Sequence, residues 1–68
     1  MEPDPIIQVR DRAYELADSG DYRVWPDISE VLKSEGHDPV CIRRLNADHF
    51  FQIMLRNRLR AARDKRNA

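Results

Sequence analysis

Residues 25–36 read Trp25-Pro26-Asp27-Ile28-Ser29-Glu30-Val31-Leu32-Lys33-Ser34-Glu35-Gly36 and include the only tryptophan of the chain. The large apolar residues of this stretch recur at helical spacing, which puts them on one face of a helix. Proline is tolerated only in the first turn of a helix and glycine often follows the last turn, so this stretch is predicted to be a helix with Pro26 in its first turn and Gly36 as its stop. Asp27 and Glu30 have the spacing of a capping box at its start. The side chains expected to point into the core are Trp25, Ile28, Val31 and Leu32.

Another helix is predicted before this stretch. Asp4 and Pro5 form its start signal, because aspartate is a good N-cap and proline fits the first helical position. Gly20 is suited to the left-handed conformation that ends many helices. The apolar stripe between these signals consists of Ile6, Val9, Ala13 and Leu16. Tyr22, in the connector that follows, is expected to pack on the core.

Two more helices are predicted after residue 36. Asp38 and Pro39 repeat the start signal. The apolar side of this third helix consists of Val40, Cys41, Ile42 and Leu45. A long last helix then runs to about Arg63, with either Asn46 or Asp48 as its cap. No glycine or proline separates the third helix from the last, so one bent helix is the alternative.

The predicted fold class is therefore all-α: a compact bundle of three or four short helices in a single domain, residues 1–68, with residues 63–68 as a frayed tail. A domain of this size buries only about 60% of its unfolded surface, so its core is marginal. Cys41 stands alone and leaves no disulfide within the chain, so regular helix packing or self-association must stabilise it. The lone cysteine and the lack of a long apolar run or a secretory signal predict a cytoplasmic protein without membrane contact.

The charge of the chain is divided, although its net value is zero. Residues 1–38 contain ten acidic and four basic residues, whereas residues 39–68 contain two acidic and eight basic ones. This asymmetry favours a basic surface for an anionic partner. Seven of the eight C-terminal bases are arginine, whose guanidinium binds phosphate and carboxylate bidentately. Pairing between the two halves, within one chain or between two, is the alternative.

The last helix combines an apolar arc with a basic stripe. At about 100° per residue, half of its circumference is apolar and is expected to face the core. That arc consists of Phe50, Phe51, Met54, Leu55, Leu59 and Ala62. The other side carries His49, Gln52, Arg56, Arg60 and Arg63. Such a stripe can lie along a phosphate backbone or enter a major groove, and a solvated helix face is the alternative.

Arg58 and Ile53 depart from this pattern. Arg58 lies within the apolar arc, so either the core ends before it or its guanidinium meets a carboxylate of a partner. The acidic half of a second copy would supply such a carboxylate. Ile53 lies outside the arc, and a displaced isoleucine beside a displaced arginine favours an intermolecular contact.

The sequence carries no recognised catalytic or metal-binding pattern. His37, Cys41 and His49 are metal-capable but lack a zinc-ligand spacing, and Cys41 is expected to be a small core residue. There is no nucleophile–base set and no glycine-rich phosphate loop. We therefore expect no enzyme, no metal, no cofactor and no small-molecule substrate. Trp25 is expected to anchor the core rather than to stack on a base.

One resemblance covers about a third of the chain. The run Ala13-x-x-Leu16-Ala17-x-Ser19-Gly20-x-Tyr22-x-x-Trp25-x-x-Ile28-x-x-x-Leu32-x-x-Glu35-Gly36 resembles a group of small bacterial proteins. These proteins share an A-x-x-L-A-x-S-G segment followed by W-x-x-I-x-x-x-L-x-x-E-G. The resemblance implies a compact helical domain and carries no established activity.

The second half of this run also resembles the W-x-x-I-A-x-x-L start of helix-turn-helix segments in recombinases and transcription regulators. A typical motif has glycine where this chain has Lys33, and Gly36 follows about one turn later. The resemblance implies a recognition helix at residues 39–45. Arg43 and Arg44 would be its exposed readers or phosphate contacts.

These observations predict a small helix-turn-helix-like nucleic-acid-binding protein with a regulatory role and DNA as its partner. Its phosphate contacts are expected to be Arg43, Arg44, Arg56, Arg60 and Arg63. The alternative is a protein–protein adaptor or a self-associating helical domain, in which the same arginines pair with carboxylates of an acidic protein or of a second copy. Zero net charge favours this alternative, because dedicated DNA binders are usually basic overall.

Overall fold

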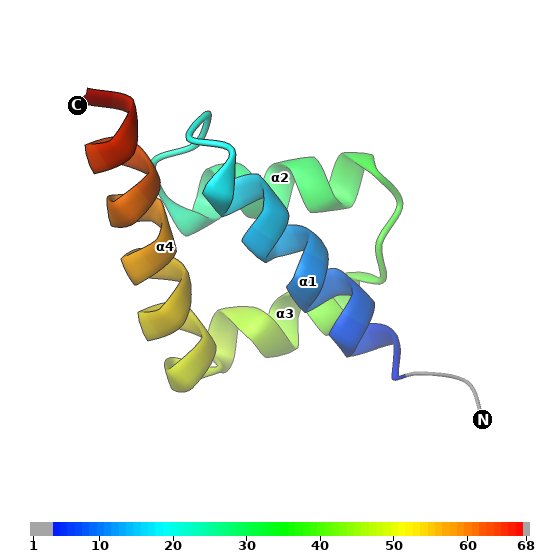
Figure 1. Cartoon of the computed structure of the whole chain (residues 1–68). Coiled ribbons are helices and arrows are strands. Elements are labelled where there is room, and N and C mark those ends of the chain that lie inside the picture. The colour runs from blue at the N-terminus through cyan, green and yellow to red at the C-terminus, as the bar shows by residue number, and fades with distance from the viewer. Residues whose placement is uncertain (1–3, 68) are drawn as a thin grey trace.

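The chain forms four helices in the computed structural model, which describes residues 4–67 and, for residues 66 and 67, the backbone alone. They are α1 (Pro5–Asp18), α2 (Trp25–Ser34), α3 (Pro39–Ala47) and α4 (His49–Asn67). No strand occurs within residues 4–67. In Figure 1, α2 and α3 run in opposite directions, α1 crosses in front of them, and α4 stands beside all three. The predicted all-α bundle is confirmed.

Aspartate side chains cap three of the four helices. The bonded pairs are Asp4 with the N–H of Ile6 at 3.0 Å, Asp38 with that of Val40 at 2.9 Å, and Asp48 with that of Phe51 at 3.0 Å. Asp48 has an extended backbone (φ −84°, ψ 104°), so α3 and α4 are separate helices and the single bent helix is excluded. The cap of the last helix is thus Asp48, and Asn46 instead binds the side chain of Trp25.

The start of α2 lies where it was predicted, with Pro26 in the first turn, but its cap differs from the prediction. The helix begins at Trp25, its N-cap is Val24, and no side chain caps it. The predicted capping box is therefore wrong, and Asp27 lies inside the first turn, where the helix dipole favours a carboxylate. The predicted stops are confirmed, because Gly20 and Gly36 have φ values of 80° and 85°, a left-handed conformation that side chains with a Cβ rarely adopt.

All four helices contribute to one core. Its buried side chains are Val9, Ala13, Leu16, Ala17, Trp25, Ile28, Leu32, Cys41, Ile42, Leu45, Phe51, Leu55 and Leu59. Tyr22, Val31 and Ile6 are partly buried against it, as expected. Phe51 lies at the meeting point of three helices: its ring is 5.4 Å from that of Tyr14 and 5.3 Å, edge to face, from that of Trp25.

The apolar arc predicted for α4 is only half correct. Phe51, Leu55 and Leu59 are buried, but Phe50 is 78% exposed and Met54 is 43% exposed. In a domain this small, a stripe of α4 little wider than about 100° is enough to contact all the neighbouring helices. The predicted apolar arc covers half of the helix, so the side chains along one edge of the arc remain exposed. Val40, expected on the buried side of α3, is also exposed.

The end of α4 also departs from expectation. The helix continues past Arg63 to Asn67, and residues 64–67 are therefore helical rather than a frayed tail. No glycine or proline interrupts this segment. Ala68, the last residue of the expected tail, lies outside the described residues.

Arg58 finds its partners within the chain. Its Nη1 donates to Asp18 Oδ2 at 2.8 Å, and its guanidinium carbon lies 4.3 Å from the centre of the Tyr14 ring. The side chain thus lies over the rim of the core while its charge is paired with the end of α1. A carboxylate from a second copy is not needed to explain this arginine, and Asp18 provides one contact between the acidic and basic halves.

A second ion-pair cluster joins α1 to the end of α2. Arg12 Nη2 lies 2.7 Å from Glu35 Oε2, and Arg12 Nε lies 3.0 Å from Glu35 Oε1, so the contact is bidentate. Arg12 also binds Glu15 at 3.0 Å, and His37 lies 3.3 Å from Glu35. The hydrogen bond from Arg12 lowers the pKa of Glu35 below its usual 4.5, and His37 adds a smaller effect in the same direction.

This cluster predicts a loss of stability in acid. The pKa of Glu35 is lower in the folded than in the unfolded chain. The contact therefore stabilises the fold fully at pH values above the pKa of Glu35 in the unfolded chain. This stabilisation is lost as the pH falls through the pKa of Glu35 in the folded chain. We expect the free energy of unfolding to decrease below about pH 4.5. Urea unfolding at a series of pH values measures this change, and Glu35→Gln should make the profile shallower. An unchanged profile in the variant would contradict the assignment.

Candidate nucleic-acid interface

Three adjoining hollows follow the contacts of α2 with α3 and α4. The largest, about 390 Å³, lies between α2 and α3 and is lined by Trp25, Pro26, Ser29, Lys33, Pro39, Ile42, Arg43 and Asn46. The second, about 260 Å³, is lined by Arg23, Val24, Trp25, Pro26, Gln52, Leu55, Arg56 and Leu59. The third, about 170 Å³, is lined by Arg23, Arg56, Leu59, Arg60 and Arg63. Because each shares lining residues with the next, we call them together the furrow.

The charge of the furrow has one sign. Its lining contains six cationic residues: Arg23, Lys33, Arg43, Arg56, Arg60 and Arg63. No aspartate or glutamate is among the lining residues. Lys33 pairs with Glu30 at 3.4 Å, whereas none of the five arginines makes an ion pair with any side chain of residues 4–65. Five guanidinium groups without an ion-pair partner in that range thus lie along one connected surface, and such a surface has a positive local field.

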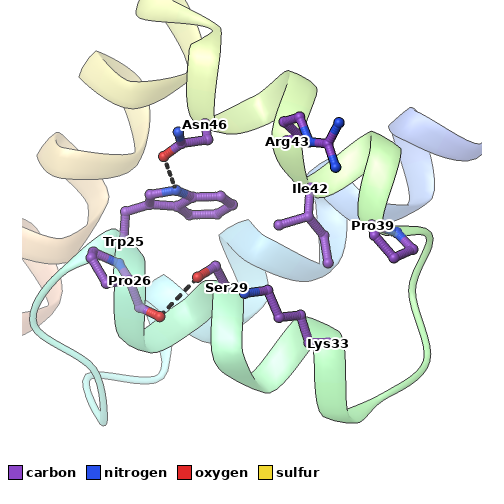
Figure 2. Close-up of a pocket in the computed structure, with 8 residues that line it drawn as sticks. All are labelled: Trp25, Pro26, Ser29, Lys33, Pro39, Ile42, Arg43 and Asn46. Carbon is purple, nitrogen blue, oxygen red and sulfur yellow. Dashed lines mark hydrogen bonds between the residues drawn. The ribbon is translucent and has the colours of Figure 1, made fainter.

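The furrow is held in shape by polar contacts at its centre. Trp25 Nε1 donates to Asn46 Oδ1 at 2.8 Å, which ties the start of α2 to the end of α3 (Figure 2). Gln52 Nε2 donates to the carbonyl oxygen of Leu45 at 3.0 Å, which ties α4 to the same end of α3. The same carbonyl also accepts from the backbone N–H of Asp48 at 3.1 Å, so Gln52 adds a second donor to it. These contacts make the furrow part of the folded core.

The structure brings together four of the five arginines predicted for the site. Arg56, Arg60 and Arg63 follow one another along α4, and Arg43 joins from α3. Arg44 does not belong to the furrow; it is exposed on α3 outside the lining of all three hollows. Of the rest of the expected polar stripe, Gln52 lines the furrow and His49 is exposed away from it.

Sequence reasoning missed two cations of the furrow. Arg23 lies in the connector before α2, and Lys33 lies in the last turn of α2. Both belong to the acidic half of the chain, so a count by halves gave them no weight. Lys33 lies one helical turn after Ser29, and that spacing puts the two side chains on the same face of α2. The only sequence signal for Arg23 is its position two residues before Trp25, which places it close to a side chain that lines the same hollow.

An apolar patch lies elsewhere on α4. Phe50, Ile53 and Met54 are 78%, 44% and 43% exposed, and their spacing puts them on neighbouring turns of one helix side. We call these three residues the α4 apolar patch. Two of them were expected in the core and the third outside it, so the patch became visible only in the folded chain.

The described residues were also compared with the requirements of a metal site and of a membrane span. No three His, Cys, Asp or Glu side chains among them are arranged to hold a metal ion. Cys41 is buried as a free thiol, which agrees with its expected place in the core. Among these residues no helix has both the length and the apolar character needed to cross a membrane.

Comparison with known proteins identified no relative: no protein-family model, no curated protein and no solved structure matched this chain. The function must therefore be argued from the geometry and charge of the furrow.

Proposed function

We propose that this protein binds nucleic acid and holds phosphates of the backbone in the furrow. The observation that carries the proposal is the lining itself, with six cations and no carboxylate. A guanidinium group offers a planar fork of donors that matches two phosphate oxygens, and it remains charged at every physiological pH. None of the five arginines forms an ion pair with a side chain of residues 4–65, so no ion pair within that range is lost when a phosphate approaches.

Zero net charge is compatible with this proposal because the charges are segregated. Arg12 and Arg58 pair with carboxylates of the acidic half, whereas the arginines of the furrow pair with none of the carboxylates described in residues 4–65. The local field of a cationic groove attracts an anionic ligand even when the whole protein is neutral. The lone buried thiol of Cys41 also fits the reducing cytoplasm, where nucleic acids are found.

The order of the elements adds a helix-turn-helix aspect to the proposal. α2 and α3 are joined by the short turn at residues 35–38. If the nucleic acid is a duplex, α3 would be the recognition helix. Arg43 supports this role from inside the furrow. Arg44 is exposed on α3 outside the furrow and would take part only if α3 entered a major groove. The corresponding biological role is that of a small bacterial regulator.

The experiment that tests the proposal is a titration with labelled oligonucleotides, both single-stranded and duplex, followed by fluorescence anisotropy. If each of the five unpaired arginines neutralises one phosphate, the logarithm of the binding constant should fall against the logarithm of salt concentration with a slope of about −3.5 for a single strand or −4.5 for a duplex. The absence of binding to either form at low salt would contradict the proposal.

The second candidate function is self-association or docking of another protein, and the α4 apolar patch favours it. Three large apolar side chains exposed together are more typical of an interface than scattered single ones. Sedimentation velocity over a range of protein concentrations distinguishes this candidate. Dimers that disappear in Phe50→Ser would support self-association, and a strict monomer at high concentration would exclude it.

A further inference from the structure

We infer that the strand held in the furrow is single, and that the hollow between α2 and α3 receives one of its bases. The inference rests on the proposed function and adds the form of the nucleic acid and the place of a base. It starts from the shape of the site, because the cations line connected hollows rather than a protruding helix.

The hollow between α2 and α3 has the chemistry of a nucleotide site. Its volume of about 390 Å³ lies within the usual range of ligand pockets. Its apolar surface comes from Trp25, Pro26, Pro39 and Ile42. In Figure 2 the indole of Trp25 and the side chain of Ile42 lie between the two helices, with Lys33 on α2 and Arg43 on α3 to either side. A flat base fits the apolar surface, and the phosphates that flank it meet the two cations.

The chemistry of the hollow is continuous with that of the rest of the furrow. Trp25 and Pro26 line both the first and the second hollow, and Arg56 leads from the second to the third. A backbone that leaves the hollow beside Pro26 therefore passes next to Arg23 and Arg56. Proteins that bind single strands combine a positive groove along the backbone with apolar or aromatic surfaces for the bases, and this furrow has both.

A duplex fits this arrangement less well. A helix that reads a duplex enters a major groove about 12 Å wide and directs several polar side chains at base edges. Outside the furrow, the exposed side chains of α3 include Val40, Arg44 and Ala47. Only Arg44 of these three carries hydrogen-bond donors. The cations of the furrow are exposed, but they come from the connector before α2 and from α2, α3 and α4, so they are not gathered on one helix that could enter a major groove.

Trp25 provides a direct readout, because it is the only tryptophan and lines the first two hollows. We would compare three probes of equal charge and of about ten nucleotides, a usual site size for such proteins: oligo(dT), the same backbone without bases, and a duplex of matched phosphate number. Oligo(dT) should change the emission of Trp25 and bind about tenfold more tightly than the abasic strand. An acidic peptide of the same charge serves as the fourth probe.

A matched pair of variants tests the place of the base. Ser29→Leu fills the hollow with a larger side chain, whereas Ser34→Leu makes the same change one to two turns later on α2, outside it. Both serines donate to a backbone carbonyl three residues earlier, so the structural cost is similar. Ser29→Leu should bind oligo(dT) no better than the abasic strand, and Ser34→Leu should keep the tenfold difference.

A second pair keeps the test valid if Ser29→Leu fails to fold. Arg43→Gln and Arg44→Gln remove the same charge from adjacent exposed positions of α3. The first should weaken binding of oligo(dT) several-fold more than the second.

The outcomes separate this inference from the proposed function. Equal affinity for oligo(dT) and the abasic strand, or tighter binding of the duplex, would overturn the single-strand inference and leave phosphate binding intact. No binding of any oligonucleotide, or tighter binding of the acidic peptide, would overturn both.

Discussion

Phe51→Ala is expected to lower the free energy of unfolding by about 3–5 kcal/mol, the usual cost of truncating a buried aromatic side chain. Phe51 is 3% exposed and holds the rings of Tyr14 and Trp25 together. Small domains have total stabilities of about 5 kcal/mol or little more, so this variant should be largely unfolded at moderate temperature. Urea unfolding followed by far-ultraviolet circular dichroism measures the loss without relying on the emission of the neighbouring Trp25.

The adjacent phenylalanine is the matched control. Phe50 is 78% exposed, so Phe50→Ala should change the free energy of unfolding by no more than about 0.5 kcal/mol. Both residues belong to the apolar arc predicted from the sequence, and that prediction would make the two variants equally harmful. Equal destabilisation would therefore contradict the orientation of α4 described above.

The triple variant Arg56→Gln/Arg60→Gln/Arg63→Gln is expected to reduce the affinity for oligonucleotides by roughly 10²-fold at 0.1 M salt. Each phosphate contact raises the logarithm of the binding constant by about 0.7 to 0.9 for every tenfold decrease in salt concentration. The electrostatic contribution is taken as zero at 1 M salt, so the loss of three contacts at 0.1 M salt costs about two logarithmic units of the binding constant. The slope of affinity against salt should also become shallower by about 2 to 3. Anisotropy titrations over about 50–200 mM salt measure both quantities.

A control with the same change in net charge shows whether the furrow matters. Arg10, Arg44 and Lys65 are exposed and lie outside the lining of the furrow, so Arg10→Gln/Arg44→Gln/Lys65→Gln should lose far less affinity. If both triple variants lost the same affinity, net charge rather than the furrow would govern binding. Circular dichroism of both variants confirms that these surface changes leave the helices intact.

Local chemistry explains why the helix boundaries could be read from the sequence. Asp4 and Asp38 act through hydrogen bonds to N–H groups two residues later, and Gly20 and Gly36 act through their own backbone conformation. Such signals depend only on neighbours in the chain. The capping box expected at Asp27 failed because the chain enters α2 earlier, at Val24, in an extended conformation. The end of α4 was misplaced because no local signal marks it.

The candidate surface could not be derived from local signals alone. The predicted arginines Arg56, Arg60 and Arg63 share one side of α4 by helical periodicity alone. Whether that side meets α2 depends on how the helices cross, and only this crossing adds Arg23, Lys33 and Arg43 to the same furrow. Arg44, next to Arg43 in sequence, lies outside it. Adjacent residues of a helix point in different directions, so only one of these two arginines can face α2. Which of them does so depends on how α3 packs, and the sequence alone did not show this.

The sequence by itself therefore indicated three or four helices, the start signals of α1, α2 and α3, the glycine stops of α1 and α2, and a core around Trp25, Ile28 and Leu32. Caps, glycine stops and apolar periodicity are encoded by residues a few positions apart. Only the tertiary structure decided that Phe51 is buried and Phe50 is not, and that Arg58 pairs with Asp18 within the chain. Only the tertiary structure showed a cationic furrow, because the angles at which helices pack depend on contacts between residues far apart in the chain.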